Sequence, residues 1–251
     1  MSSSAHVVAI IQTRMTSTRL PGKTLAPLAG RPMLEHIIDR ARRIQGVHAV
    51  WIATTNDGTE QPILDLCTRL KAPVYQGSVD DVLARYAETA AKAKADVIVR
   101  ITSDCPFIDP EVSARVVRYY IDSLPRFAFV SNTGRRTYPR GLDTEVFSRE
   151  SLDAAHHEAT ERLDREHVTR FIFKHPQRFS VGNVADNVDF SQLRLTVDTP
   201  EDYALVSRLY ADLYPSHPQF TYPDVLNWFD HHPDMTRQNA HIAQKDAHEL
   251  Q

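Results

Sequence analysis

The residues best suited to chemistry lie in one short loop, Gln12–Leu25, with the sequence QTRMTSTRLPGKTL. It holds the cations Arg14, Arg19 and Lys23 together with several hydroxyl groups and a glycine. The loop directly follows Val7–Ile11, an apolar run that predicts a buried strand. In open α/β sheets, ligands bind beyond the carboxyl ends of the strands. We therefore interpret the loop as a phosphate-binding loop. The alternative is an exposed basic turn with solvated charges.

The dipeptide Gly22-Lys23 raises the question of a Walker A loop, the P-loop of many nucleotide-binding proteins. That motif requires a glycine five residues before the Gly-Lys pair. The chain has Ser17 at that position. The spacing therefore excludes a Walker A loop, and Ser17 stays a candidate hydroxyl group for phosphate binding.

A carboxylate follows a later strand, which is predicted at Asp96–Ile101. In the next residues, ITSDCPFID, Asp104 stands just past the strand end. Because parallel strands all end at one edge of a sheet, Asp104 is expected to face the same crevice as the loop. Magnesium favours one or two carboxylates together with phosphate oxygens. Asp104 could equally be an N-cap or turn residue before Pro106, whereas Asp109, directly before Pro110, is the more natural cap of the following helix.

A second carboxylate, Asp198, occurs in the segment LTVDTPED at Leu195–Asp202. Thr199 as cap, Pro200 at the first helical position and two acids in the first turn predict a helix start. Asp198 is not needed for that cap. Two aspartates from distant segments, together with a cationic loop, would form a metal–triphosphate site.

Two further segments could contact substrates. In YQGSVDDVLARY, the Gly77-Ser78 turn could present backbone groups to the edge of a pyrimidine, or Ser78 could simply cap the helix that follows. Arg140 in the segment TYPRGLDTE, together with Arg135 and Arg136 just before it, could hold an anionic acceptor. Loops rich in arginine are, however, often only solvated. Asp143 and Glu145 are in the same segment.

Histidine and cysteine give weaker signals. The 12 histidines include two adjacent pairs, whereas a helical metal site requires histidines four residues apart. We do not expect a zinc site. Cys67 and Cys105 are too few for a disulfide framework. Although Cys105 adjoins Asp104, it is interpreted as a small buried thiol rather than a nucleophile.

The composition is that of a globular protein. Of 251 residues, 42% are hydrophobic and 24% charged, and the formal net charge is −3. We therefore expect small-molecule substrates and no nucleic-acid partner. No segment reaches the roughly 20 apolar residues of a membrane span, and no signal peptide is evident. These features and the two cysteines favour a cytoplasmic location.

The order of elements predicts an α/β fold. Strands are expected at 7–11, 50–54, 72–75 and 96–101, and helices at 31–44, 60–70, 79–94 and 110–121. Such units form a mostly parallel sheet with right-handed crossovers. After residue 124 we expect strands at 127–130, 144–147, 179–184 and 193–197, with helices at 149–159, 164–174, 200–210 and 223–229. The chain is expected to form one domain, with residues 1–214 as its nucleotide-binding part and 215–251 as a C-terminal helical extension.

The loop resembles the signature loop of the CMP-sugar synthetases, the cytidylyltransferases that activate acidic sugars such as KDO and sialic acids. The branch named after the spore-coat polysaccharide biosynthesis protein SpsF is the more similar one. Where the wider family has Pro-Ala-Arg, this chain has Gln12-Thr13-Arg14, as suits that branch. The other matching segments cover nearly the whole chain: GSVDDVLARY, RITSDCPFID, YPRGLDTEVF, REHVTRFIFKHP, LRLTVDTPEDY and NAHIAQK.

The resemblance implies a nucleotide-diphospho-sugar transferase fold of the glycosyltransferase-A type, which is Rossmann-like with a mixed sheet of about seven strands. It implies CTP as substrate and Mg²⁺ as cofactor. It assigns Arg14 and Lys23 to the triphosphate, Asp104 and Asp198 to the metal, and Gly77-Ser78 to the cytosine region. On the acceptor side it adds Glu166 and His167 to Asp143 and Glu145. A homodimer is expected by analogy.

These features together predict a magnesium-dependent cytidylyltransferase. It would transfer CMP from CTP to an acidic sugar or a related acceptor during surface polysaccharide or glycoconjugate biosynthesis. Two alternatives are a glycosyltransferase that uses a nucleotide sugar and a noncatalytic nucleotide-binding protein of the same fold. A glycosyltransferase usually has an Asp-x-Asp metal motif, where this chain has Ser103-Asp104-Cys105.

Overall fold

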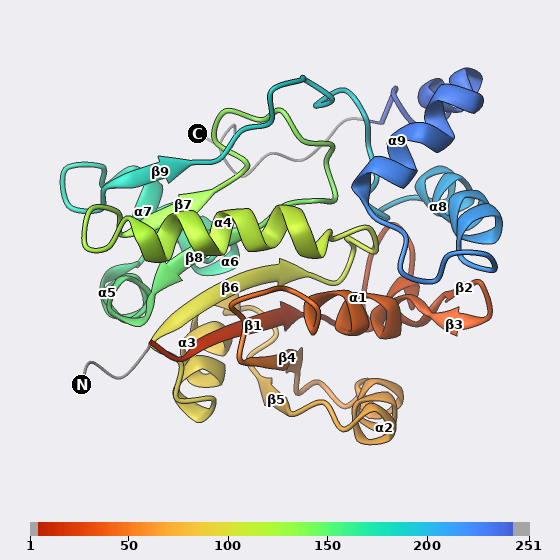
Figure 1. Cartoon of the computed structure of the whole chain (residues 1–251). Helices are drawn as coiled ribbons and strands as arrows, with labels where there is room; N and C mark the ends of the chain where they lie inside the picture. Colours follow the sequence, from red (N-terminus) through yellow and green to blue (C-terminus); the bar gives the residue numbers. More distant parts are fainter. Residues whose placement is uncertain (1–4, 243–251) are drawn as a thin grey trace.

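The computed structural model describes residues 5–242 and arranges them around one seven-stranded sheet (Figure 1). The sheet contains β1 (Val7–Gln12), β4 (Ala49–Thr55), β5 (Val74–Gly77), β6 (Val97–Thr102), β7 (Phe129–Ser131), β8 (Glu145–Ser148) and β9 (Val181–Asn183). Their spatial order is β5-β4-β1-β6-β8-β7-β9. Strand β8 runs antiparallel to both of its neighbours, and every other pair is parallel. The prediction of a mixed, mostly parallel sheet with flanking helices is confirmed.

Helices connect and cover the strands. They are α1 (Met33–Ala41), α2 (Gln61–Leu70), α3 (Val82–Lys92), α4 (Pro110–Asp122), α5 (Arg149–Glu158), α6 (Arg162–Glu166), α7 (Arg170–Lys174), α8 (Pro200–Leu213) and α9 (Tyr222–His231). Two short 3₁₀ helices are η1 (Lys23–Leu25) and η2 (Pro233–Arg237). A small antiparallel pair is formed by β2 (Pro27–Leu28) and β3 (Arg31–Pro32).

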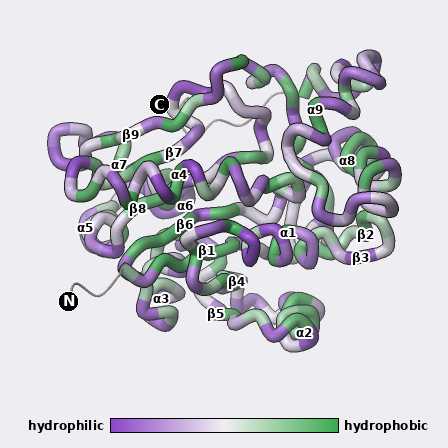
Figure 2. The backbone as a smooth tube through the Cα atoms, in the orientation of Figure 1, coloured by the Kyte–Doolittle hydropathy of each residue, from purple (hydrophilic) through white to green (hydrophobic). Residues whose placement is uncertain are grey.

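The sheet separates two hydrophobic cores. In β1, Val7, Ala9 and Ile11 belong to one core, and Val8 and Ile10 belong to the other, as the two-residue period of a strand requires. Helices α1, α2, α4, α8 and α9 contribute to the first core, whereas α3, α5 and α7 contribute to the second. Figure 2 shows the hydrophobic stretches along β1 and β6 in the middle of the molecule. A buried strand with both faces covered positions the loops at its ends rigidly.

Two predicted helix starts were wrong. The first helix starts at Met33, because Pro32 has an extended ψ of 139° and pairs within the β2–β3 hairpin. Ser78 does not cap α3. Asp81 is the cap, and its carboxylate accepts the Ala84 N–H at 2.9 Å. The Gly77-Ser78 turn therefore precedes the helix instead of forming its first turn.

The predicted helix at 164–174 consists of two separate helices, α6 and α7. Between them, Val168 is completely buried with a φ of +50°. That left-handed conformation is unfavourable for a β-branched residue and cannot continue an α-helix. Burial of Val168 in the second core accompanies the break. The periodicity of the sequence does not predict such a break, because the break depends on contacts with residues that are distant in the sequence.

The predicted strand at 193–197 is also wrong, because the segment forms only one isolated bridge, between Arg194 and Arg140. Its backbone hydrogen bonds go to two different loops. The Leu195 N–H donates to the Arg140 carbonyl at 2.7 Å, and the Val197 N–H donates to the Asp104 carbonyl at 2.8 Å. The segment therefore links the two loops rather than extending the sheet.

The described part of the C-terminal extension packs on the first core. Phe220, Tyr222 and Trp228 are buried there with residues from α1 and α8. Residues 243–251, including the end of the NAHIAQK segment, lie outside the described residues, so the boundary at 214 stays a prediction. Within residues 5–242, no helix is both long enough and apolar enough to cross a bilayer.

Candidate functional site

The loop after β1 folds back on itself and directs Lys23 inward. The Met15 carbonyl accepts the N–H groups of Ser17 and Gly22, at 3.0 and 3.1 Å. A buried hydrogen bond of 2.6 Å joins the hydroxyl groups of Thr13 and Thr24. Together these contacts fix both ends of the loop, so that Lys23 starts η1 with its side chain only 12% exposed.

Lys23 lies between the two aspartates that the sequence singled out. Its Nζ donates to Asp198 Oδ1 at 2.9 Å and to the Val197 carbonyl at 2.6 Å. It is also 3.5 Å from Asp104 Oδ2. Arg19 from the same loop is 3.2 Å from Asp198 Oδ2. We call Arg19, Lys23, Asp104 and Asp198 the Lys23 cluster.

Asp104 has no helix-capping role. Asp109 caps α4 instead, by accepting the N–H groups of Glu111 and Val112. Asp104 Oδ1 accepts a hydrogen bond of 2.5 Å from Thr102, while Oδ2 faces Lys23. The cap is therefore excluded for Asp104, whereas the residue does lie in a turn, as the alternative also allowed. Its carboxylate faces Lys23 and is 29% exposed.

Asp198 is held more firmly than Asp104. Its Oδ2 accepts a hydrogen bond of 3.0 Å from Arg194, which also binds Asp202 at the start of α8. Thr199 and Asp202 form the predicted capping box of that helix. The helix start therefore fixes Arg194, and Arg194 in turn fixes Asp198.

The two charges at the centre of the cluster stabilise each other. Burial by itself would raise the pKa of Asp198, but Lys23, Arg19 and Arg194 lower it below the usual value. Burial would likewise lower the pKa of Lys23, whereas Asp104 and Asp198 raise it above the usual value. Both groups are therefore ionised at neutral pH.

A second group of polar residues surrounds the Gly77-Ser78 turn. The Ser78 carbonyl accepts a hydrogen bond of 2.6 Å from Arg85, and its hydroxyl accepts the Asp81 N–H at 3.1 Å. Arg85 is only 2% exposed, and its Nε has no hydrogen-bond partner within the described chain. Arg14 interacts electrostatically with Arg85.

Sequence reasoning missed Arg85, although a signal was present. Arg85 occurs between apolar positions of α3, such as Leu83 and Tyr86, where a solvated charge is not expected. Arg100 is a similar case, because it interrupts the apolar run of β6. A lone charge within a buried pattern is a marker of a polar site inside the fold.

The predicted acceptor-side residues occupy different environments. Arg136 binds Asp143 through two hydrogen bonds, at 2.5 and 3.0 Å. Glu145, at the start of β8, accepts 2.8 Å and 3.2 Å hydrogen bonds from Arg100 and Thr169. Because Arg100 also donates to the side chain of Gln12 at 3.2 Å, Glu145 is linked to the end of β1 and so to the first loop.

The remaining predicted acceptor-side residues are Arg140, Glu166 and His167. The backbone of Arg140 pairs with the 193–195 segment. Glu166 is exposed at the end of α6, and His167 follows it. Their neighbour Arg165 binds Asp81 at the start of α3. The 165–167 segment therefore lies closer to the Gly77-Ser78 side than the sequence indicated.

The comparisons with known proteins agree with this fold. Residues 8–245 match the family model described as cytidylyltransferase. The spore coat polysaccharide biosynthesis protein SpsF of Bacillus subtilis is 31% identical, over 91% of this chain and 95% of its own length. A cytidylyltransferase structure from Leptospira borgpetersenii superposes with a TM-score of 0.89 at 28% identity, over 96% of this chain and 100% of that one. The structure of CMP:2-keto-3-deoxy-manno-octonic acid synthetase complexed with CTP gives a TM-score of 0.65 at 19% identity, over 83% and 99%.

Proposed function

The chain belongs to the cytidylyltransferase family, and we propose that it transfers CMP from CTP to an acidic sugar or a related acceptor. The reaction releases pyrophosphate and serves surface polysaccharide or glycoconjugate biosynthesis. The observation that carries the proposal is the Lys23 cluster, in which one lysine of the first loop lies within 3.5 Å of two carboxylates from distant segments. A carbohydrate acceptor is supported by the likeness to the spore coat polysaccharide biosynthesis protein.

The cluster suits an in-line attack of an acceptor oxygen on the α-phosphorus. Negative charge on the phosphate oxygens is then stabilised by cations that are already in place. Lys23 acts as a point charge toward the departing pyrophosphate, and Arg14 and Arg19 act as planar forks. Because protein acceptors already order the Lys23 ammonium, little conformational entropy is lost when it binds phosphate.

The donor set of the cluster fits a magnesium ion. Asp104 and Asp198 are the residues that would hold it, since hard cations favour one or two carboxylates with phosphate oxygens. The lowered pKa of Asp198 keeps that carboxylate available. When bound, the ion would neutralise phosphate charge and favour nucleophilic attack.

The Gly77-Ser78 turn is proposed to bind the cytosine. A side chain at Gly77 would place its Cβ 3.1 Å from both Arg85 and Tyr75, so the turn closes tightly over these residues. Arg85 holds the Ser78 carbonyl, and its Nε has no hydrogen-bond partner among residues 5–242. We assign Arg85 to positioning the turn.

The acceptor is proposed to bind between the Gly77-Ser78 side and the β7–β8 loop. Arg140 and Asp143 belong to that loop, and Glu145 follows it. Glu166 and His167 border the space from α6. Arg140 and the preceding arginines of the loop would hold the carboxylate of an acidic sugar, since guanidinium groups bind carboxylates bidentately.

Pyrophosphate release is the decisive assay. Purified enzyme is incubated with Mg²⁺, each of the four nucleoside triphosphates, and a panel of sugar acids and sugar phosphates. We expect release only with CTP and with sugar acids. Lys23→Ala should lower kcat/KM for CTP by about 100-fold or more, as for loss of one charge-stabilising donor. The matched control is Lys92→Ala, an exposed lysine in the last turn of α3.

Two results would contradict the proposal. The first is no CTP-dependent release with any acceptor, and the second is transfer from a preformed nucleotide sugar under the same conditions. The second outcome would identify a glycosyltransferase, which needs no cluster for a triphosphate.

A further inference from the structure

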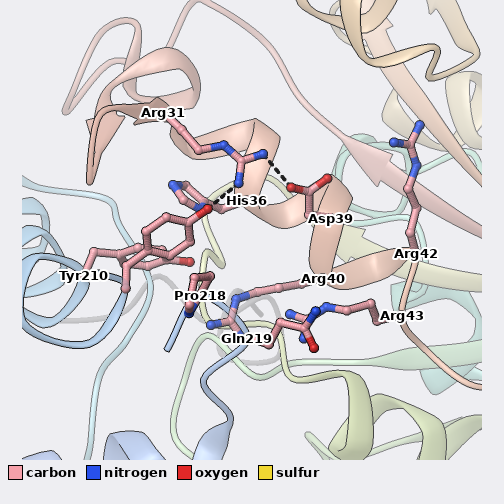
Figure 3. Close-up of a pocket in the computed structure, with 10 residues that line it drawn as sticks. Arg31, His36, Asp39, Arg40, Arg42, Arg43, Tyr210, Pro218 and Gln219 are labelled. Carbon is pink, nitrogen blue, oxygen red and sulfur yellow. Dashed lines mark hydrogen bonds and ion pairs between the residues drawn. The ribbon is translucent and has the colours of Figure 1, made fainter. Parts of the chain in front are cut away.

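A cavity of about 300 Å³ lies outside the Lys23 cluster, between α1, α8 and the loop before α9 (Figure 3). Four arginines line it, with Asp39 as the only carboxylate among its lining residues. The other lining groups include His36, Tyr210 and Gln219. The lining therefore carries an excess of positive charge, although the whole chain has a net charge of −3.

Two of the four arginines are already neutralised or turned away. Arg31 binds Glu35 at 2.7 Å and Asp39 at 2.5 Å. Arg42 donates to the carbonyl groups of Leu70 and Lys71, and Figure 3 shows its side chain pointing away from the others. The excess charge therefore belongs to Arg40 and Arg43.

Arg40 is a buried cation that forms no close ion pair within the described residues, although it interacts electrostatically with Asp224 and with the Tyr210 hydroxyl. It is 4% exposed, and its Nη2 has no hydrogen-bond partner within residues 5–242. Its guanidinium lies over the Phe220 ring, 4.2 Å from the centroid. A cation–π contact offsets only part of the cost of burying a charge.

Arg43 lies beside Arg40 and increases that cost. Figure 3 shows both side chains extending toward Gln219. Burial and the charge of Arg40 lower the pKa of the Arg43 guanidinium, and the opposing charges of Asp109 and Asp39 do not fully offset that effect. Two adjacent guanidinium groups in a half-enclosed cavity are stable together when an anion lies between them.

We propose that this cavity binds a small phosphate-bearing anion. Guanidinium forks match the tetrahedral oxygens of phosphate, and the Gln219 amide supplies a further donor. A volume of about 300 Å³ is at the lower limit of small-molecule pockets and admits phosphate, pyrophosphate or a small phosphate monoester. The cavity shares no lining residue with the Lys23 cluster, so the assignment holds whether or not the proposed function is correct.

Calorimetric titration tests the site. The protein is Lys23→Ala, which removes the buried lysine of the other candidate phosphate site and leaves Arg14 and Arg19 there. The probes are inorganic phosphate, pyrophosphate and a sugar phosphate, at fixed ionic strength. At least one should bind with a stoichiometry near one. Adding Arg43→Gln should weaken that binding at least tenfold, whereas adding Arg42→Gln should leave it unchanged.

Arg43→Gln is the key variant because Arg43 is only half-buried, and its thermal unfolding checks the fold. Arg40→Met, which keeps the apolar contact with Phe220, gives a second test if it folds. The proposal is overturned if none of the three probes binds, or if binding is equally strong with and without Arg43. The probe that binds most tightly identifies the source of the phosphate.

Discussion

Asp198→Asn tests the central electrostatic claim about the Lys23 cluster. The change keeps the size of the side chain and removes one negative charge that faces Lys23 at 2.9 Å, Arg194 at 3.0 Å and Arg19 at 3.2 Å. The Thr199 capping box is untouched. The variant should therefore fold, lose nucleotidyl transfer and be less stable.

The size of the destabilisation follows from the three contacts. Arg19 is 36% exposed and contributes little. Arg194 keeps Asp202 as a partner. The main loss is the pair with Lys23, whose remaining carboxylate, Asp104, is 3.5 Å away. Breaking a buried charge pair of this kind costs about 2–4 kcal/mol of unfolding free energy, which lowers Tm by roughly 10 °C at this chain length.

The pH dependence has a definite sign. Because the folded-state pKa of Asp198 is lowered, its stabilisation is complete above the usual value of 3.8 and is lost as the pH falls through the folded-state pKa. The Tm difference between wild type and Asp198→Asn should be constant from pH 5 to 8 and should shrink below pH 4. Thermal unfolding followed by circular dichroism measures this difference.

Asp65→Asn is the matched control, since Asp65 is an exposed carboxylate on α2. It should leave both Tm and turnover unchanged. An Asp198→Asn variant as stable as the wild type at pH 7, or a Tm difference that grows toward pH 3, would refute the reasoning.

Three further predictions concern other parts of the structure. Gly141→Ala should lower the unfolding free energy by about 3 kcal/mol or more in denaturant titrations, because φ is +104° and a Cβ would lie 2.6 Å from the Leu195 carbonyl carbon. Cys67 and Cys105 should resist a thiol reagent at pH 8 in the native protein, and both should react after unfolding. Burial raises the pKa of the Cys67 thiol to about 11, and burial together with the charge of Asp104 raises the pKa of the Cys105 thiol. Arg85→Met should reduce the preference for CTP over UTP in the pyrophosphate assay without lowering Tm, since it removes a buried charge at similar volume; a lower Tm with unchanged preference would make Arg85 purely structural.

The sheet and the approach of distant residues could be predicted from the sequence. Apolar runs located β1 and β6, and the rule that parallel strands end at one edge placed Lys23 and Asp104 together. The structure has these two side chains 3.5 Å apart. Asp198 was found by elimination, because the helix cap after it was already complete. Local rules succeeded here because each residue directly follows or precedes a regular element.

Features that depend on long-range contacts could not be predicted. Val168 separates α6 from α7 by a left-handed conformation, and its side chain is buried in the second core. Asp81 replaces Ser78 as the cap of α3, and it also binds Arg165 from a distant segment. The ion pairs of Lys23 with Asp104 and Asp198 could likewise not be predicted. Residue spacing predicts that these residues lie at the same edge of the sheet, but it does not predict which charges pair.

The connection between β7 and β8 has a consequence for variation among related enzymes. Asn132 closes the 132–144 loop at its base, where it accepts the Thr144 N–H at 2.9 Å and donates to the Leu142 carbonyl at 2.8 Å. Because these hydrogen bonds hold the two ends together, the length of the loop can change at a small entropic cost at its exposed residues, Gly134 and Arg135, whereas residues 137–142 are packed against the 193–195 segment. Insertions and deletions in this hairpin should therefore alter which acceptor is taken without disturbing the crossovers that carry Lys23 and Asp104. The exposed part of this loop can therefore differ between related enzymes while the sheet and the loops that carry Lys23 and Asp104 keep their structure.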